Sequence, residues 1–482
     1  MVFNSAVFLF AFLPVVFIVY RLMPGMRAKN ALLAGFSLLF YAFGSPGQAL
    51  LMLGAAAVNW LAGRLLAGRK GSRAVLAAAV ALDLGLLFAF KYLDFFTGIA
   101  NRVLGLSLPM AGLTLPVGIS FYTLSGLSYL IEVRRDPARA SRGFGRVLLF
   151  MGMFPTAAAG PILNWAAFEP QLDARECTPE KTAAGIRRFV LGLSKKLLVA
   201  DVLGRFVDVV YGSSVLDARL AWLAALGYAV QIYFDFSGCA DMAIGLGGLF
   251  GFTLPENFRL PYLAASVTEF WSRWHMSLTA WFRTYLYYPL TMSRALNRWR
   301  RRLSAAGRKK AASRVVSVAA LAVVWLLTGL WHGPSWCYIL WGVWHGLFNI
   351  LEGVKVIDTR RVGKKAGGRA LLHVYTFLVT LLGAVLFRSA DPAQAGRMFA
   401  AMFAGFSFSA EGTLLLQKSL SGLTAAAFAV GAAGSLGALP WLRERTGRAG
   451  EIASYILCAG LFALCVLAMA GGGFRPFIYA QF

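Results

Sequence analysis

The chain has 482 residues, of which 59% are hydrophobic and 14% charged, and its formal net charge is +26. Apolar runs of membrane-spanning length recur from end to end, which excludes a soluble enzyme and predicts an all-α polytopic membrane protein. The basic residues gather in short segments between these runs, as they do in cytoplasmic loops, so we expect membrane lipids and no nucleic acid as partners. No intervening segment is long enough for a soluble domain, and residues 1–482 are predicted to form one membrane-embedded domain.

The first half of the chain predicts a regular series of crossings. The first apolar run has no cleavage signal after it and is expected to remain as an anchor. A Gly-Ser-Pro-Gly turn at residues 44–47 divides the second run into two helices. When basic segments are assigned to the cytoplasm, residues 2–20 cross inward, residues 30–63 go out and back, and the runs at 74–90, 104–131 and 147–167 cross outward, inward and outward.

An acidic stretch follows the last of these runs and is predicted to be an external loop; it contains Glu169, Asp173, Glu176 and Glu180. The path from residue 183 to residue 289 is interrupted by charges, which indicates re-entrant or interfacial helices buried in protein. Three further spans are predicted at residues 370–387, 419–442 and 452–474. At about 20 residues per crossing, about 11 to 14 membrane segments are expected in all.

Residues 235–289 hold the densest mixture of aromatic, acidic and basic side chains in the chain. Ser266 and Glu269 form a capping box, which predicts a helix over residues 267–285. On that helix His275 would share a face with Trp271, Leu278 and Phe282. Such a helix suits a tunnel wall, and an aromatic-belt helix at the headgroup level is the alternative.

Asp235 and Asp241 flank a short polar segment between apolar runs. Two carboxylates at membrane depth could bind a cation, relay protons or pair with nearby arginines. We favour pairing, because buried charges usually persist by having partners. Asp83, alone in an apolar run, is expected to have a similar explanation.

Residues 315–351 contain no Asp, Glu, Lys or Arg, yet they hold two of the four histidines, each within a Trp-His-Gly tripeptide. The run is too long for one helix, so Gly333-Pro334-Ser335 must break it. His332 would then lie at a helix end where side chains can face a cavity, and His345 would lie inside the next helix as a second catalytic group or a positioning partner. A satisfied core histidine is the alternative for both.

A neutral imidazole in a water-poor site is a competent general base toward an alcohol, and it could return the proton to a leaving thiolate. If the acyl donor is already a thioester, the site needs no serine or cysteine nucleophile. The five cysteines are scattered and form no metal-ligand spacing, so no metal site is predicted. The absence of a glycine-rich phosphate loop argues against a nucleotide-driven pump.

Several motifs lie along nearly the whole chain: Met-Val-Phe-Asn-Ser at residues 1–5, Tyr-Phe-Asp-Phe-Ser-Gly at 233–238, Leu-Pro-Glu-Asn-Phe at 254–258, Phe-Trp-x-Arg-Trp-His-x-Ser-Leu at 270–278 and Thr-Gly-x-Trp-His-Gly at 328–333. Together they resemble the membrane-bound O-acyltransferase (MBOAT) family, in particular its bacterial branch of alginate O-acetyltransferase membrane subunits. One departure follows Pro289, where the Gly-Gly-Asn of this branch is missing. Details of that cytoplasmic loop therefore stay open.

The resemblance implies a ring of transmembrane helices around a central tunnel, with His332 as the catalytic histidine at the tunnel base. His275 falls in the family's other motif and is a further candidate, beside His345. Six residues in and around these motifs are predicted to bind substrate: Asn257, Trp271, Arg273, Trp274, Trp331 and Ser277.

By the same resemblance, the enzyme binds no permanent cofactor and takes acetyl from cytoplasmic acetyl-CoA. The acetyl group would go to an extracytoplasmic, alginate-like polysaccharide through a partner protein, and the chain would lie in the bacterial inner membrane. Two alternatives stay open: transfer of a D-alanyl or other acyl group from a carrier protein to a cell-wall polymer, and a lipid or polysaccharide transporter. Crossing parity puts the Gly333-Pro334 break toward the outer side, whereas the resemblance requires His332 deep in a tunnel.

Overall fold

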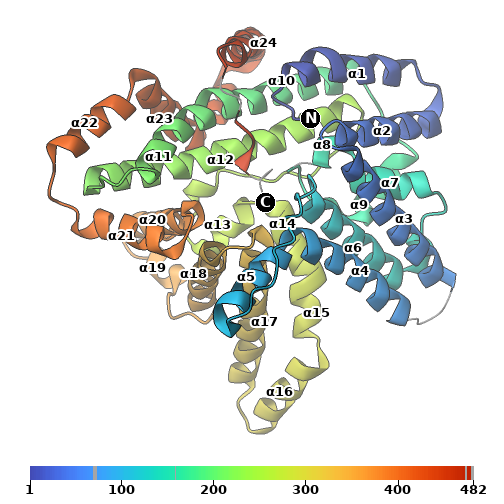
Figure 1. Cartoon of the computed structure of the whole chain (residues 1–482), viewed down its shortest axis with the longest axis horizontal. Coiled ribbons are helices and arrows are strands. Elements are labelled where there is room, and N and C mark those ends of the chain that lie inside the picture. Colours follow the sequence, from blue (N-terminus) through green and yellow to red (C-terminus); the bar gives the residue numbers. More distant parts are fainter. Residues whose placement is uncertain (69–72, 158, 473–474, 479–482) are drawn as a thin grey trace. The chain divides into compact units, whose positions relative to one another are not determined.

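The computed structural model describes all of residues 1–482 except 69–72, 158, 473–474 and 479–482. Helices are its only regular elements over the described residues, which confirms the predicted all-α fold class (Figure 1). The chain divides into two compact units. Unit 1 comprises Met1–Leu193, Gly238–Glu256 and Cys458–Phe482, and unit 2 comprises Ser194–Ser237 and Asn257–Leu457.

Unit 1 is built mainly from the first ten α-helices. A buried group of phenylalanines packs at its centre, with Phe8 against Phe40 and Phe12 against Phe154 edge-to-face, and Phe40 against Phe154 tilted. The predicted turn at residues 44–47 is confirmed, because α2 ends at Ala42 and α3 begins at Pro46. The helices are α1 (Leu13–Leu22, preceded by the π-helix Phe8–Phe12), α2 (Gly25–Ala42), α3 (Pro46–Gly68), α4 (Arg73–Lys91), α5 (Leu93–Leu104), α6 (Ile119–Arg135), α7 (Phe144–Gly152), α8 (Phe154–Ala157), α9 (Trp165–Phe168) and α10 (Pro179–Ser194).

The crossing predicted at residues 104–131 is wrong in its first half. α5 ends at Leu104, and the backbone to Val117 is not helical. Side chains of α5 hold this loop, since the Asp94 carboxylate accepts hydrogen bonds from the backbone N–H groups of Ala111 and Gly112. Only α6, from Ile119, continues the apolar run as a helix.

The crossing predicted at residues 147–167 is also wrong, because this segment is re-entrant. It begins next to the end of α6, where the Ser141 backbone N–H donates to Tyr129 Oη at 3.2 Å. It returns to the same place, where Trp165 Nε1 donates to the backbone oxygen of Arg139 at 2.8 Å. α7 and α8 are each too short to cross a hydrocarbon core of about 30 Å.

The re-entrant segment places the acidic stretch beside basic residues, which corrects the predicted external loop. The Arg146 guanidinium donates to both carboxylate oxygens of Asp173, at 2.5 and 2.8 Å, and this bonding lowers the pKa of that carboxyl. Arg21 donates to the backbone oxygen of Cys177 at 3.0 Å. Asp173 and the backbone at Cys177 therefore each contact an arginine of unit 1.

Unit 2 contains most of the remaining helices, and α12 contributes residues to both units. Side-chain caps start several of these helices, including Ser266, Ser293, Ser335, Asp391 and Ser409. The helices are α11 (Asp201–Tyr211), α12 (Ala218–Leu249), α13 (Val267–Arg273), α14 (Met276–Phe282), α15 (Tyr288–Thr291), α16 (Arg294–Ala305), α17 (Lys309–His332), α18 (Trp336–Gly353), α19 (Thr359–Gly363), α20 (Gly368–Arg388), α21 (Pro392–Ala404), α22 (Ala410–Ser419) and α23 (Gly422–Ser435). The last helix, α24 (Ala438–Ala470), also divides between the units.

Five helices in the described part of the chain are long and apolar enough to cross a membrane, or six if α22 and α23, which meet at 72°, form one broken span. The five segments are Pro46–Gly68, Arg73–Lys91, Lys309–His332, Gly368–Arg388 and Ile452–Ala470. The expected 11 to 14 segments exceed this number because the structure divides other apolar runs into short or bent helices. The run predicted at residues 419–442 is one of these.

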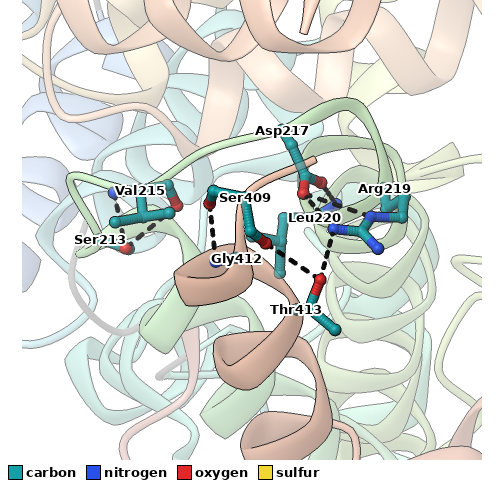
Figure 2. Close-up of polar contacts among 8 residues, drawn as sticks. All are labelled: Ser213, Val215, Asp217, Arg219, Leu220, Ser409, Gly412 and Thr413. Carbon is teal, nitrogen blue, oxygen red and sulfur yellow. Dashed lines mark hydrogen bonds and ion pairs between the residues drawn. The ribbon is translucent and has the colours of Figure 1, made fainter. Parts of the chain in front are cut away.

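Polar contacts at one edge of unit 2 connect the start of α12 to α22 (Figure 2). Asp217 Oδ1 accepts a hydrogen bond from the Leu220 N–H at 3.0 Å and so caps α12. Asp217 Oδ2 accepts from Arg219 at 2.7 Å, and the same guanidinium donates to Thr413 Oγ1 at 3.2 Å. Burial acts to raise the pKa of Asp217, but these hydrogen bonds outweigh it and hold that pKa below its usual range.

Candidate active site

The helix hairpin of α17 and α18 supports the candidate site. α17 ends at His332 and α18 begins at Trp336, so the predicted break at Gly333-Pro334-Ser335 is confirmed. The Ser335 hydroxyl caps α18 by accepting from the Cys337 N–H at 3.2 Å. The α17 end that carries His332 is therefore fixed by a short, capped turn.

Glycines bring α17 and α18 into close contact. A Cβ at Gly329 would lie 2.5 Å from the Tyr338 backbone oxygen, and one at Gly342 would lie 2.6 Å from that of Trp325. Gly346, in the second Trp-His-Gly tripeptide, leaves room for the Trp325 side chain, whose Cβ would be 2.8 Å away. The two tripeptides thus use glycine differently, since Gly333 ends a helix and Gly346 permits helix packing.

His332 is 1% exposed and is surrounded by aromatic rings. Its ring centroid lies 4.8 Å from that of Trp341 and 5.2 Å from that of Phe387, both nearly perpendicular, and 5.0 Å from that of Trp331. Phe387 lies near the end of α20, which begins beside the basic segment at residues 355–369. α17 also begins among basic residues, so both helices start at a basic end and carry His332 and Phe387 at their opposite ends.

His345 lies within α18, the helix that follows His332, and is also buried among tryptophans. Its ring centroid is 5.0 Å from that of Trp271 and 5.1 Å from that of Trp341. The Trp271 indole N–H donates to His345 Nδ1 at 3.4 Å, a long hydrogen bond. Because an indole can only donate, this contact assigns the lone pair to Nδ1 and the hydrogen to Nε2 of a neutral His345.

His275 does not lie inside a helix, which corrects the predicted helix over residues 267–285. The Ser266 cap starts α13 as expected, with its hydroxyl accepting from the Glu269 N–H at 2.9 Å. The helix then stops at Arg273, and His275 adopts a left-handed backbone conformation with φ of 44° before α14. His275 therefore does not share a continuous helix face with Trp271 and Leu278.

A neighbouring segment explains this break. The Met276 backbone N–H donates to the Asn257 oxygen at 3.0 Å, and the Arg259 N–H donates to the Arg273 oxygen at 2.9 Å. These hydrogen bonds replace those that a continuous helix would make. The φ of 44° is uncommon for a residue other than glycine, and such strain often marks a functional position.

The Asn257 side chain fixes the protonation pattern of His275. Asn257 Oδ1 accepts from the Ser277 backbone N–H at 3.1 Å, which identifies this amide atom as the oxygen. It also accepts from Ser277 Oγ at 2.9 Å and lies 3.2 Å from His275 Nδ1. His275 Nδ1 must therefore carry the hydrogen, and the lone pair of the neutral ring is on Nε2.

The three histidines belong to one cluster in unit 2. Trp331 connects His275 to His332, with ring centroids 6.2 and 5.0 Å away, and Trp341 connects His332 to His345. We call the following residues the histidine–tryptophan cluster: His275, His332, His345, Trp271, Trp325, Trp331 and Trp341. His332 and His345, which follow His275 by 57 and 70 residues in the sequence, thus share one water-poor region with it. A buried, neutral imidazole in such a region suits general-base chemistry on an alcohol.

The other residues predicted for the site separate into two groups. Asn257 and Ser277 contact or support His275, and buried Asn257 Nδ2 has no hydrogen-bond partner among the residues that the structure describes. Trp274 instead stacks on Phe270 at 5.5 Å. Arg273 forms an ion pair with Glu269 at 2.7 Å, so the structure gives neither Trp274 nor Arg273 a place in the cluster.

Sequence reasoning missed Trp325, Trp341 and Phe387. The two tryptophans lie in the same charge-free run as His332, and nine residues separate His332 from Trp341. The high number of tryptophans in that run was the sequence feature that could have indicated them. Phe387 carries no comparable sequence signal, because only the packing of α20 on α18 brings it to His332.

The acids predicted to need partners have them. In unit 2, Asp235 pairs with Lys196 at 2.6 Å, and Lys196 also pairs with Asp201 at 2.8 Å. The next residue of α12, Phe236, contacts the His275 ring edge-to-face at 4.6 Å. In unit 1, Asp241 accepts from Arg188 Nε at 3.0 Å. Within the described ranges, no three His, Cys, Asp or Glu side chains are grouped to hold a metal ion.

A cavity of about 260 Å³ reaches the cluster from the side of α13, α14 and α17. Trp271 and Trp325, which both contact the His345 ring, form part of its wall. The surface of the cavity is mostly apolar, although polar and apolar residues are equally represented in its remaining lining: Thr268, Ser272, Leu278, Thr279, Phe282, Arg283, Tyr287, Tyr288, Leu321, Val324, Thr328 and Asn349. Such a space accommodates a slender, mostly apolar group.

Comparison with known proteins decides the family. The sequence model of the membrane-bound O-acyltransferase family matches residues 86–305, which include His275 but not His332. The chain is 38% identical to the probable alginate O-acetylase of Pseudomonas aeruginosa over 84% of its length and 75% of that protein. The chain belongs to the membrane-bound O-acyltransferase family. It is therefore an acyltransferase.

Two further relatives have names that refer to cell-wall polymers. The chain is 31% identical to the peptidoglycan O-acetyltransferase of Helicobacter pylori, over 72% of this chain and 69% of that one. It is 27% identical to the teichoic acid D-alanyltransferase of Bacillus subtilis, over 49% of this chain and 59% of that one. Membership of an acyltransferase family favours an enzyme over the transporter that the sequence left open.

Proposed function

We propose that this acyltransferase takes acetyl from cytoplasmic acetyl-CoA and passes it across the bacterial inner membrane for O-acetylation of an extracytoplasmic, alginate-like polysaccharide. The observation that carries the proposal is the histidine–tryptophan cluster at the end of α17, away from the basic cytoplasmic segment, with a cavity that approaches it from the α17 midpoint. The names of the alginate and peptidoglycan relatives support O-acetylation of a polysaccharide.

The donor enters from the basic side in this proposal. α16 and α17 form a hairpin (Figure 1), and residues 298–314, which include the turn between these helices, hold eight Lys or Arg and no acid. These cations suit the phosphates of CoA. Arg283 and Tyr288, which line the cavity, lie on the chain segment that leads to α16, so the pantetheine arm can extend from the phosphates into the cavity.

The acetyl thioester would then lie near Trp271 and Trp325, on the approach to the histidines. α17 rises about 1.5 Å per residue, so His332 is about 10 Å beyond Trp325 along the helix. This arrangement reconciles the two expectations from sequence, because His332 can lie near the outer end of α17 and still be reached through a buried path. The acetyl group would move toward the extracytoplasmic side as it approaches His332.

The chemistry assigned to His332 is general-base catalysis. Its neutral imidazole accepts the proton of an acceptor hydroxyl as the oxygen attacks the acetyl carbonyl, the carbon–sulfur bond breaks, and the departing CoA thiolate takes the proton. If His332 instead accepts the acetyl group itself, a covalent acetyl-protein accumulates when no acceptor is present. Asn257 Nδ2, a buried donor beside His275, can hydrogen-bond an oxygen of the substrate.

Final transfer to the sugar is assigned to a separate extracytoplasmic partner protein. The longest segments between helices in the described chain hold no domain that could enclose a polymer. No cofactor remains bound between turnovers in this scheme, because acetyl-CoA is a substrate. Purified protein that acetylates oligosaccharide alone at a useful rate would remove the partner from the proposal.

Transfer of a D-alanyl group from a carrier protein is the second candidate, supported by the name of the Bacillus subtilis relative. The same donor site could take a phosphopantetheine arm attached to a protein. Acetyl-CoA and an aminoacylated carrier protein, offered separately, distinguish the two donors.

The experiment that tests the proposal is release of free CoA from acetyl-CoA by the purified protein in nanodiscs. Wild type is compared with His332→Ala, and His373→Ala serves as the matched control, because His373 lies outside the cluster and contacts the Ala264 backbone oxygen at 3.1 Å. We expect turnover that is lost with His332→Ala and kept with His373→Ala. Absence of turnover with acetyl-CoA, together with turnover from a carrier protein, would overturn the acetyl donor.

A further inference from the structure

A buried carboxyl in unit 1 has no ion-pair partner among the residues that the structure describes. Asp83 is near the middle of α4, one of the membrane-spanning helices, and its side chain is 4% exposed. An ionised carboxylate at this depth costs several kcal/mol unless it is paired. The residues that the structure describes include no Lys or Arg in an ion pair with Asp83, whereas Asp235, Asp241 and Asp217 each have one.

The nearest basic residue on the same helix, Lys91, does not form an ion pair with Asp83. Lys91 follows it by eight residues, about 12 Å along the helix axis. Its Nζ donates to Ser120 Oγ at 2.9 Å. Tyr122 of α6 lies within electrostatic range of Asp83, but its buried hydroxyl has no hydrogen-bond partner in the described chain. The neutralisation of Asp83 must therefore come from elsewhere.

Asn59 of α3 is the partner that Asp83 has. Its Nδ2 donates to Asp83 Oδ1 at 2.9 Å and to the Ala55 backbone oxygen at 3.0 Å. Asn59 is fully buried, and a Cβ at Gly126 of α6 would lie 2.8 Å from Asn59 Oδ1. The amide is thus held between three helices, with little freedom to turn away from the carboxyl.

Each side chain of this pair has an oxygen that the hydrogen bond between them does not use. Asn59 Oδ1 and Asp83 Oδ2 are both buried, and neither has a hydrogen-bond partner among the described residues. Both are acceptors if Asp83 is ionised, so two unsatisfied oxygens would remain in an apolar layer at a cost of about 1–3 kcal/mol each. One proton on Asp83 Oδ2 removes the charge and supplies a donor for Asn59 Oδ1.

We propose that Asp83 and Asn59 form a proton-binding site, in which the neutral Asp83 carboxyl donates from Oδ2 to Asn59 Oδ1 while Asn59 Nδ2 donates to Asp83 Oδ1. The two planar groups then form a ring closed by two hydrogen bonds. The site joins α3 to α4 beneath α6 without placing a charge in the membrane. It differs from the Lys196–Asp235 pair of unit 2, where an opposite charge does the same task. This inference does not rest on the proposed function.

Infrared difference spectroscopy on the protein in nanodiscs tests the proposal. The carbonyl stretch of a protonated carboxyl lies apart from carboxylate and amide bands and shifts in D₂O. We expect wild type at neutral pH to show such a band that Asp83→Asn removes. A wild-type spectrum without an Asp83-dependent band would overturn the proposal.

Thermal unfolding of two variants provides an independent readout. Asp83→Asn can form an amide–amide ring of the same shape, so we expect a melting temperature within a few degrees of wild type. Asp83→Leu removes the carboxyl that bonds the Asn59 amide and leaves that amide only its hydrogen bond to the Ala55 oxygen, so we expect a clearly lower melting temperature. Equal destabilisation by both variants would contradict the proton site, and so would a wild-type melting temperature that depends on sodium or potassium concentration, which would indicate a bound cation instead.

Discussion

His275 and His332 are both buried histidines of unit 2, yet the structure holds them by different means. His275 lies at a strained helix break, and its Nδ1 contacts the amide oxygen of Asn257 at 3.2 Å. His332 ends a regular helix, and the rings of Trp341 and Phe387 face its imidazole edge-to-face. Hydrogen bonding to Asn257 assigns one tautomer to His275, whereas aromatic packing at His332 fixes the plane of the ring.

This difference suggests different roles within one cluster. A ring that must gain and lose a proton benefits from rigid surroundings that fix its orientation, as Trp341 and Phe387 do at His332. A ring with an assigned tautomer presents the same nitrogen, here Nε2, to its neighbours in every turnover. We therefore assign proton transfer to His332 and a positioning role to His275.

We expect the largest loss of activity from replacing His332, the proposed proton-transfer residue. His332→Ala should lower the rate of CoA release by about 10²–10⁴-fold, the usual contribution of a general base. His275→Ala should lower it less, because it removes a positioning group. Single-turnover measurements with acetyl-CoA check the order, and a greater loss with His275→Ala would reverse the assignment.

The next effect tests whether Asn257 sets the His275 tautomer. Asn257→Leu removes the acceptor for His275 and for the Ser277 N–H, and we expect roughly a 10-fold loss of kcat and a destabilisation of about 1–3 kcal/mol. Asn257→Asp keeps an acceptor oxygen and should retain more activity. The pH dependence of kcat distinguishes positioning from packing, since only a change in the His275 protonation pattern shifts that profile. Identical profiles for both variants and wild type would leave Asn257 a purely structural residue.

The Trp341 ring contacts both His332 and His345, so its replacement tests whether aromatic packing orients His332. Trp341→Phe keeps a ring beside His332, and we expect a several-fold loss of kcat with KM for acetyl-CoA nearly unchanged. Trp341→Leu removes the ring and should cost more in both activity and stability. Equal activity of the two variants would show that the edge-to-face contact does not orient His332.

Helix packing at the hairpin provides a stability test. Gly346→Ala would place a Cβ 2.8 Å from the Trp325 Cβ, and we expect a destabilisation of about 1–3 kcal/mol. Gly353→Ala on the same helix is the matched control, because nothing lies within 4 Å of its added Cβ. Thermal unfolding in nanodiscs measures both. A Gly346→Ala protein as stable as Gly353→Ala would show that α17 and α18 separate easily.

The smallest effect concerns His345. Trp271→Phe keeps a ring in the cluster and removes the indole N–H that donates to His345 Nδ1 at 3.4 Å. Since this hydrogen bond is long, we expect a loss of about 0.5–1.5 kcal/mol in stability and only a few-fold change in kcat. A loss as large as that of His332→Ala would instead place His345 in the chemical step.

The amino-acid sequence determined the features that depend on local chemistry. The charge-free run at residues 315–351 and its Gly-Pro break predicted the α17–α18 hairpin, because a longer helix could not fit the membrane and proline could not continue it. The Ser266 capping box predicted the start of α13. Isolated acids at membrane depth predicted partners of opposite charge, which Asp235 and Asp241 have, whereas Asp83 is hydrogen-bonded to the uncharged Asn59 amide.

Only the tertiary structure decided the features that depend on contacts between distant segments. The helix predicted across His275 is interrupted because the backbone at Asn257 and Arg259 supplies its hydrogen bonds. The segment that includes residues 147–167 turns back, since Ser141 ahead of it bonds the Tyr129 hydroxyl and Trp165 near its end bonds the backbone oxygen of Arg139. Apolar periodicity records burial but not the neighbour that buries a residue. The sequence therefore determined where the histidines lie along the chain, and only packing decided that three of them lie in one cluster.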